Sequence, residues 1–502
     1  MLFFYGFFAW APPEKRYETF QIIYDKIVWY FSFEIFTEDN EMEYRIEHDT
    51  LGDVRVPAAH KWGAQTQRCF DNFKIGHRMP AEIIHAFAVM KKCCAVVNKE
   101  MAGLDSDKAA AICEACDEIA KGVWDEEFPL VVYQTGSGTQ TNMNMNEVIA
   151  HLANEKLSAK GIAKSVHPND DVNKSQSSND TFPAAMHMAA VDALHSSLYG
   201  PLDGLIATFE KKSEKYMHIV KNGRTHVQDA VPLTFGQEIS GWVTMLKRAR
   251  DMIHDGEKYM LPLALGGTAV GTGLNAPKGF GERVAAEIAR ETGYPFSDEE
   301  NKFYALTGRD NFVFLHGALE GLAADCMKFA DDIRLLASGP RSGLGEISIP
   351  ANEPGSSIMP GKVNPTQCEA LTMVTCRVHG NQATVALAAS QGRFELNVYA
   401  PVMADAFLES CRLLGAAMAS FDAHCAQGME PIEKRMKYLV ENSLMLVTSL
   451  SPHIGYEKAA AISKKAFEEG TSLREAAMQL GYVTSDEYDE YIQPAKMTNV
   501  DR

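Results

Sequence analysis

Long stretches of this chain place apolar side chains at the three- and four-residue spacing of an α-helix. One stretch follows the polar segment that ends at Asp180 and continues for about thirty residues. Others lie within residues 80–124, 311–336, 367–389 and 402–425, and the segment 133–157 begins with a Gly-rich polar loop and continues as such a helix. The alternation of apolar and polar positions that marks strands is scarce. The pattern therefore predicts a mostly α-helical protein.

Several of these helices are apolar on more than one side and rich in Ala, Met and Leu. This composition is typical of a helical bundle whose outer faces pack against further subunits. After Gln427 the pattern changes to short helices with turns, which indicates a small separate domain. We expect an appended segment at residues 1–43, an N-terminal domain at 44–179, a central bundle domain at 180–427 and a C-terminal domain at 428–502.

The first 43 residues are aromatic and differ from the rest of the chain. Their leading apolar run is about ten residues, too short to span a membrane. They lack the basic start of a signal peptide and the Arg-rich, acid-poor composition of a transit peptide. We therefore expect no membrane association and a cytoplasmic location; for a eukaryotic source the mitochondrion is the alternative, which this N-terminus does not favour.

The formal charge of -18 disfavours nucleic acid as a partner, because phosphate binding normally requires a basic surface. An anionic ligand would need a local positive site on this acidic molecule. The sequence has no P-loop, no GxGxxG after a predicted strand and no HExxH. Neither a nucleotide nor a zinc site is indicated, and we expect no metal and no cofactor.

Four polar loops each precede an apolar helix, at residues 135–142, 167–180, 223–229 and 355–365. A Ser, Thr or Asn before a helix is more often a cap than a ligand contact. Together, however, the loops supply the hydroxyl, amide and cationic groups that bind a small dicarboxylate. These groups belong to Ser137, Thr139, Asn179, Thr225, Lys362 and Asn364.

Three further residues are candidates for proton transfer. His226 is a general acid or base candidate if another loop brings a carboxylate to it, and otherwise a structural hydrogen-bonding group. Glu369 is a candidate partner, or simply a favourable charge in a first helical turn. Ser356 becomes a base only if backbone N–H groups and Lys362 stabilise its alkoxide; the alternative is an ordinary flexible loop.

The residues of these loops and their order along the chain resemble the sequence blocks of one family. "GSGTQTNMNMNE", "HPNDDVNKSQSSND", "GRTHVQDAVPLT", "NKFYAL" and "GSSIMPGKVNP" are similar to the sequence blocks of class II fumarate hydratase, within the fumarase/aspartase superfamily. The resemblance covers about nine tenths of the chain, from Arg45 to the end. Aspartase-like relatives usually carry Gln at the position of His226 and another residue at Gly361. Argininosuccinate and adenylosuccinate lyases have more basic signature loops.

The resemblance implies three mostly helical domains, with the central bundles of four chains forming a twenty-helix core in a homotetramer. Each active site would contain residues from three subunits. The implied reaction is the reversible, metal-independent hydration of fumarate to L-malate, a step of the tricarboxylic acid cycle. The alternatives are an ammonia-lyase that acts on aspartate and a non-catalytic helical homologue.

The resemblance also assigns roles to individual residues. Ser356 would be the base at carbon, supported by Lys362, and His226 the acid-base partner, oriented by Glu369 from another subunit. Lys362 and Asn364 would hold one carboxylate. The other implied substrate-binding or supporting residues are Ser137, Gly138, Thr139, Ser177, Ser178, Asn179, Thr225 and Ser357. A second dicarboxylate site is implied at His167, Pro168, Asn169 and Asp170.

Overall fold

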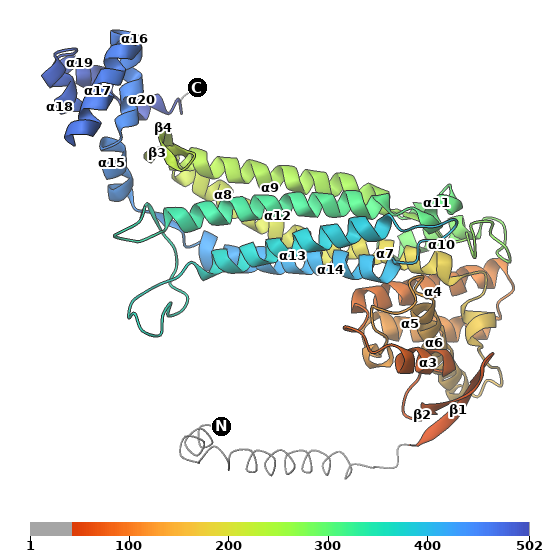
Figure 1. Cartoon of the computed structure of the whole chain (residues 1–502). Helices are drawn as coiled ribbons and strands as arrows, with labels where there is room; N and C mark the ends of the chain where they lie inside the picture. Colours follow the sequence, from red (N-terminus) through yellow and green to blue (C-terminus); the bar gives the residue numbers. More distant parts are fainter. Residues whose placement is uncertain (1–42, 501–502) are drawn as a thin grey trace, which may run out of the picture.

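The computed structural model describes residues 43–500, and Figure 1 shows a long helical bundle with a smaller helical unit at each end. The prediction of a mostly helical fold is confirmed. Apart from Glu43, the expected N-terminal extension lies outside the described residues. None of the described helices is long and apolar enough to cross a membrane.

The unit at the N-terminal end combines one hairpin with a layer of helices. The hairpin pairs β1 (Tyr44–Asp49) with β2 (Gly52–Pro57). The helices are α3 (Ala64–Asn72), α4 (Ala81–Met101), α5 (Ser106–Ala120) and α6 (Thr139–Ala159), with short turns η1 (Asp125–Glu127) and η2 (Pro168–Val172).

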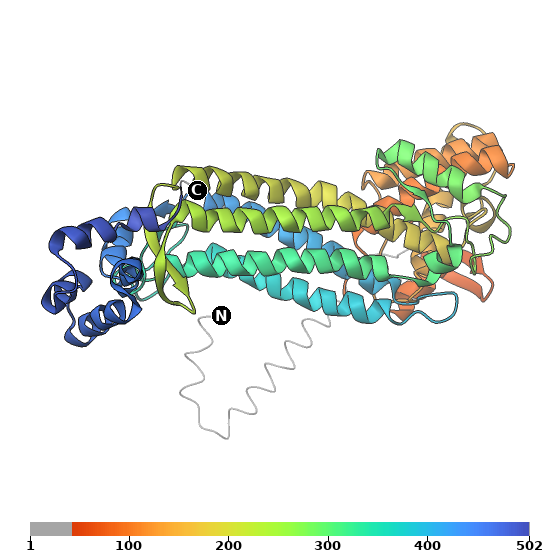
Figure 2. The same ribbon diagram turned by 90° about the horizontal axis from the view of Figure 1, so that it is seen from above.

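The bundle contains the longest helices of the chain. They are α7 (Ser178–Ala193), continued through the π-turn η3 (Leu194–Leu198) into α8 (Tyr199–Lys215), then α9 (Phe235–Glu257), α12 (Asp310–Leu336), α13 (Thr366–Ala389) and α14 (Ala400–Phe421), which ends in η5 (Asp422–Ala426). At 1.5 Å per residue, α12 alone is about 40 Å long. The bundle therefore holds the two end units far apart along its long axis (Figure 2).

The π-turn within the first bundle helix has a local cause. Pro201 has no N–H, so the carbonyl of Ser197 lacks its usual partner one turn later. Gly415 of α14 packs there, and a Cβ at this glycine would lie 2.0 Å from the Ser197 oxygen. A small residue is thus required where the two helices meet.

Short elements connect the bundle helices. They are η4 (Lys258–Met260), α10 (Phe280–Thr292), α11 (Lys302–Thr307), the parallel pair β5 (Pro262–Leu263) and β6 (Ser297–Asp298), and the antiparallel pair β7 (Ile347–Ser348) and β8 (Glu430–Pro431). A longer hairpin pairs β3 (Val220–Thr225) with β4 (Gln228–Thr234).

The C-terminal unit has its own apolar core, from Val440 to Tyr488, whereas the main core extends from Val56 to Met436. Its elements are α15 (Glu433–Glu441), η6 (Leu444–Leu450), α16 (Ser451–Ile454), α17 (Tyr456–Glu469), α18 (Leu473–Leu480), α19 (Ser485–Tyr491) and α20 (Pro494–Met497). The exact domain boundaries expected at 44, 180 and 428 stay predictions.

Candidate active site

The first two polar loops meet where α6 and α7 begin. The Ser137 hydroxyl lies 2.9 Å from that of Thr139, which in turn lies 2.8 Å from the Ser178 hydroxyl. Gly138 makes this turn possible: its φ is +71°, and a Cβ there would lie 2.0 Å from the Phe182 ring. The structure therefore joins hydroxyl groups some forty positions apart in the sequence into one chain of hydrogen bonds.

The start of α7 is held by a capping box. The Ser177 hydroxyl accepts a hydrogen bond from the Asn179 N–H, and Asp180 accepts one from the Ser177 N–H. The Asn179 side-chain amide donates to the carbonyl of Ala269, at 2.8 Å. Ser177 thus acts as a cap in this chain, which is the more common role of a Ser before a helix.

Buried charged side chains support this corner, and sequence reasoning did not identify them. Asp180 is completely buried and also accepts hydrogen bonds from the N–H groups of Gly266 and Thr268; burial raises its pKa to about 6. Nearby, burial lowers the pKa of the Lys91 ammonium to about 8. Lys91 donates to the side chains of Asn173 and Gln176 at 3.1 and 2.9 Å, so this buried lysine of α4 holds the loop before α7 in place.

The expected second dicarboxylate site is an exposed turn. His167 precedes η2, a single π-helical turn of Pro168–Val172 that includes Asn169. The His167 ring nitrogen Nδ1 accepts a hydrogen bond from the Asp170 N–H at 3.2 Å, and the His167 N–H donates to Asp171. His167 thereby caps its own turn, and a role in binding a second ligand stays a prediction.

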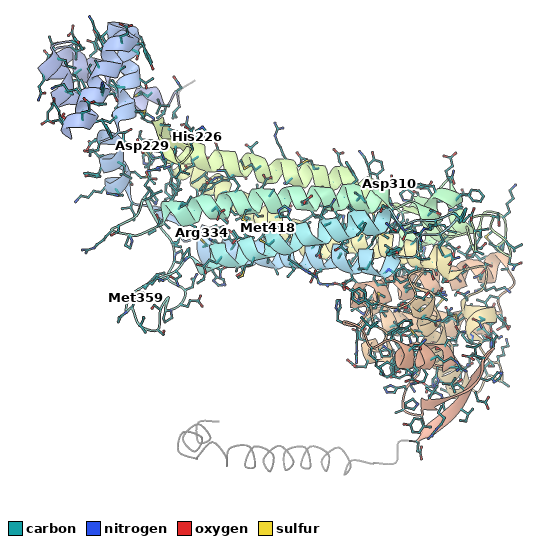
Figure 3. The ribbon with its side chains drawn as sticks, in the orientation of Figure 1. His226, Asp229, Asp310, Arg334, Met359 and Met418 are labelled. Atoms are coloured by element: carbon teal, nitrogen blue, oxygen red, sulfur yellow. The ribbon has the colours of Figure 1, made fainter. Side chains whose placement is uncertain are left out.

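The segment around His226 is a hairpin, whereas the sequence suggested only a polar loop before a helix. Thr225 pairs with Gln228, and His226 with Val227 forms the two-residue turn. Both turn residues have positive φ, 56° and 60°. That region favours Gly or Asn, and a β-branched valine is strained there. All four of these side chains are exposed, so the tip presents the His226 imidazole to the exterior (Figure 3).

The loop that carries Ser356 is closed on itself. The Gly355 N–H donates to the Lys362 carbonyl at 2.9 Å, and the Asn364 amide donates to the Gly355 carbonyl at 2.7 Å. The Ser356 Oγ accepts hydrogen bonds from the N–H groups of Ile358 and Met359, at 3.3 and 3.0 Å. Two backbone donors therefore already point at the oxygen that was expected to act as a base.

The charged groups of the same loop face outward. Lys362 and Ser357 are exposed on the loop, and Glu369 is exposed in the first turn of α13. Met359 marks how far this loop projects from the end of the bundle (Figure 3).

Apart from the turn at His167, the predicted catalytic and substrate-binding residues thus form three separate groups in one chain. One group lies at the end of the bundle next to the N-terminal unit and consists of Ser137, Gly138, Thr139, Ser178 and Asn179. The His226 hairpin and the Ser356 loop lie at the opposite end (Figures 1 and 3). Among residues 43–500, no hydrogen bond joins a site residue of one group to a site residue of another. Within the described part of one chain, these three groups are therefore not brought together.

Comparison with known proteins identifies the class of molecule. The lyase family model matches residues 52–380, and the model of the fumarase C C-terminus matches residues 446–499. A crystal structure of recombinant class II fumarase from Schistosoma mansoni superposes with a TM-score of 0.90 at 41% identity, covering 92% of this chain and all of that one. The fold is that of the lyase family.

Curated relatives narrow the assignment within this class. The chain is 58% identical over 457 residues to fumarate hydratase class II of Listeria monocytogenes, covering 91% of this chain and 100% of the relative. It is 57% identical to fumarate hydratase class II of Bacillus subtilis, covering 91% of this chain and 99% of the relative. The chain belongs to the class II fumarate hydratase family.

Proposed function

We propose that this protein catalyses the reversible hydration of fumarate to L-malate at sites built jointly by several copies of the chain. The observation that carries the activity is the match to class II fumarate hydratases over 91% of this chain. The chain also contains the expected residues Ser356, Lys362, Asn364, His226 and Glu369. A non-catalytic homologue would be free to lose these residues.

Ser356 is proposed as the base that removes a proton from the carbon beside one malate carboxylate. This step produces an aci-carboxylate dianion, and serine can take the proton only if its alkoxide is stabilised. The N–H groups of Ile358 and Met359 provide two donors to Oγ. Lys362 on the same loop adds a positive charge, and donors fixed before the reaction are the most effective means of stabilising such charge.

His226 is proposed to protonate the departing hydroxyl group on the opposite face, or to activate water in the reverse direction. The imidazole stands at the tip of its hairpin, exposed and free to enter a site on a neighbouring copy. Glu369 from another subunit would orient it. Histidine suits this task because its unperturbed pKa lies near neutrality.

The remaining donors are proposed to hold the two carboxylates. Lys362 and Asn364 would bind one of them. The hydroxyl chain Ser137–Thr139–Ser178, with Asn179 and Thr225, would bind the rest of the substrate. Hydroxyl and amide donors backed by helix N-termini suit an anion without any metal.

A shared site requires that copies of the chain associate, and the bundle surface supports this. On α13 the residues Met373, Cys376, Gly380, Ala383 and Leu387 recur every three or four positions and are exposed. Met373 and Leu387 are both 67% exposed, and a Cβ at Gly380 would meet no atom within 4 Å. An exposed apolar stripe with this spacing is typical of a helix that packs against another subunit. We infer a homotetramer.

The ultraviolet absorbance of fumarate tests the activity directly. In buffer without ammonium, the purified protein should consume fumarate until malate and fumarate reach equilibrium. Loss of fumarate only when ammonium is added would identify an ammonia-lyase instead. No loss under either condition would identify a non-catalytic homologue.

A further inference from the structure

Four charged side chains meet beneath the hairpin that carries His226. The guanidinium of Arg224 binds both carboxylate oxygens of Glu346, at 2.7 and 3.3 Å. The Lys221 ammonium lies 3.0 Å from Glu238 and 3.6 Å from Glu346. Glu346 is fully buried and Lys221 is 1% exposed, so the contacts are shielded from water.

The hairpin needs such support. A two-stranded hairpin is marginally stable by itself, and the turn at His226 and Val227 has an unfavourable backbone conformation. The β3–β4 register also shifts between Asn222 and Arg224, at Gly223. A Cβ at Gly223 would lie 2.5 Å from the Val231 carbonyl oxygen, so this irregularity depends on glycine.

Two members anchor this network to the bundle: Glu238 lies in α9, and Glu346 is held by its backbone. The Glu346 N–H donates to the carbonyl of Leu336 at the end of α12, and its carbonyl accepts from the N–H of Ile432. It also stands directly before β7, the strand that leads into the Ser356 loop. Its backbone is therefore fixed while its carboxylate holds the first strand of the hairpin.

We propose that Glu346 is a positioning residue for His226. Its two-point contact with Arg224, one residue before Thr225, sets the direction in which the strained turn presents the imidazole. This inference rests on the proposed role of His226 and goes beyond it, because Glu346 is buried and acts only through the hairpin.

The first test compares Glu346→Gln, which removes the charge but preserves the shape, with Glu346→Asp. The control is Glu82→Gln, which breaks an Arg–carboxylate pair of 2.6 Å with Arg412 at the other end of the molecule. Small displacements of a catalytic group reduce turnover by about 10- to 100-fold. We expect a loss of that size in kcat for Glu346→Gln with little change in KM, partial recovery with Glu346→Asp, and near-normal kcat for Glu82→Gln. Normal kcat in Glu346→Gln would overturn the proposal.

Mixed tetramers then distinguish a hairpin effect from a general structural effect. If Glu346 acts on the hairpin of its own chain, mixing Glu346→Gln with Ser356→Ala chains restores activity, because intact hairpins and intact loops are both present. Mixing Glu346→Gln with His226→Asn chains does not, because every hairpin is then defective. The opposite pattern, or recovery in neither mixture while a reference mixture of Ser356→Ala and His226→Asn recovers, would overturn the proposal.

Two further measurements keep the inference testable under other outcomes. If Glu346→Gln does not form a tetramer, Arg224→Lys takes its place in the mixtures, because it keeps the charge and removes the two-point contact. If the reference mixture itself does not recover, the shared-site proposal fails, and a double-mutant cycle of Glu346→Gln with Arg224→Lys decides this one. If the double variant loses less activity than the two single variants combined, expressed as the free energy of activation from kcat, the result supports positioning through that contact. Fully additive losses contradict it.

Discussion

Ser356 depends on its surroundings for any role as a base, since a free serine hydroxyl is far too weak an acid. Its Oγ accepts two backbone hydrogen bonds within a loop closed by Gly355 and Asn364. Ser356→Ala should therefore lower kcat by orders of magnitude. Tetramer mass and helical content should not change, since within residues 43–500 the hydrogen bonds of the Ser356 side chain both come from its own loop. Near-normal turnover in this variant would remove Ser356 as the base.

At the scale of single residues, the sequence identified the polar groups but not the buried charges. Ser137, Thr139 and Ser178 were predicted to serve one ligand, and they are hydrogen-bonded to one another. The burial of Glu346 could not be predicted, because a charged residue is usually exposed and the partners Lys221 and Arg224 lie more than a hundred positions away.

At the scale of elements, the long helices were predictable and the hairpin was not. An apolar period sustained over twenty or more residues specifies a helix, as in α12 and α13. Strand β3 reads Val-Lys-Asn-Gly-Arg-Thr, with only one apolar residue and a register shift that interrupts alternation. The contact of Arg224 with Glu346 that supports this hairpin spans more than a hundred positions, so a polar loop was the natural prediction.

The turn before α6 should tolerate a side chain less well than another left-handed glycine does. Gly138 and Gly161 both have left-handed φ values, +71° and +68°, but only Gly138 faces a neighbour, the Phe182 ring, while Gly161 has none within 4 Å. Gly161→Ala should cost about 1 kcal/mol of stability, the usual penalty for that conformation. Gly138→Ala should cost more and raise KM, because the ring clash displaces Ser137 and Thr139. Thermal unfolding and steady-state kinetics test this, and equal effects of the two substitutions would contradict it.

At the scale of the whole molecule, stability should depend on pH through buried histidine. Burial lowers the pKa of His187 from 6.5 to about 4, and the ring is held between the Pro262 carbonyl and the Asn311 amide. Between pH 6.5 and 4, His187 binds a proton in the unfolded chain but stays neutral in the folded chain. The stability this ring contributes is thus complete above pH 6.5 and decreases as pH falls toward 4.

The measurement compares variants, because buried acids such as Asp180, whose pKa is raised, act in the opposite direction. The stability difference between the wild type and His187→Gln should shift by up to about 1.4 kcal/mol per pH unit between pH 6.5 and 4, in favour of the variant. Urea unfolding at several pH values measures it, with the exposed His48→Gln as control. A constant difference for His187→Gln would show that folding does not change the pKa of this ring, and would contradict the prediction.

For the assembled protein, we propose that each active site combines residues from several chains. The hydroxyl groups near Ser137 and the residues His226 and Ser356 lie at opposite ends of a bundle about 40 Å long. The exposed apolar stripe on α13 provides a surface on which other copies can supply what each chain lacks.

Activity in mixed tetramers tests this claim most directly. Ser356→Ala and His226→Asn chains, each inactive alone, are dissociated, mixed and reassembled, and the loss of fumarate absorbance is followed in ammonium-free buffer. Shared sites predict partial recovery, because some sites then combine an intact hairpin with an intact loop from different chains. Mixed tetramers that form, as shown by mass, and yet stay inactive would contradict the account.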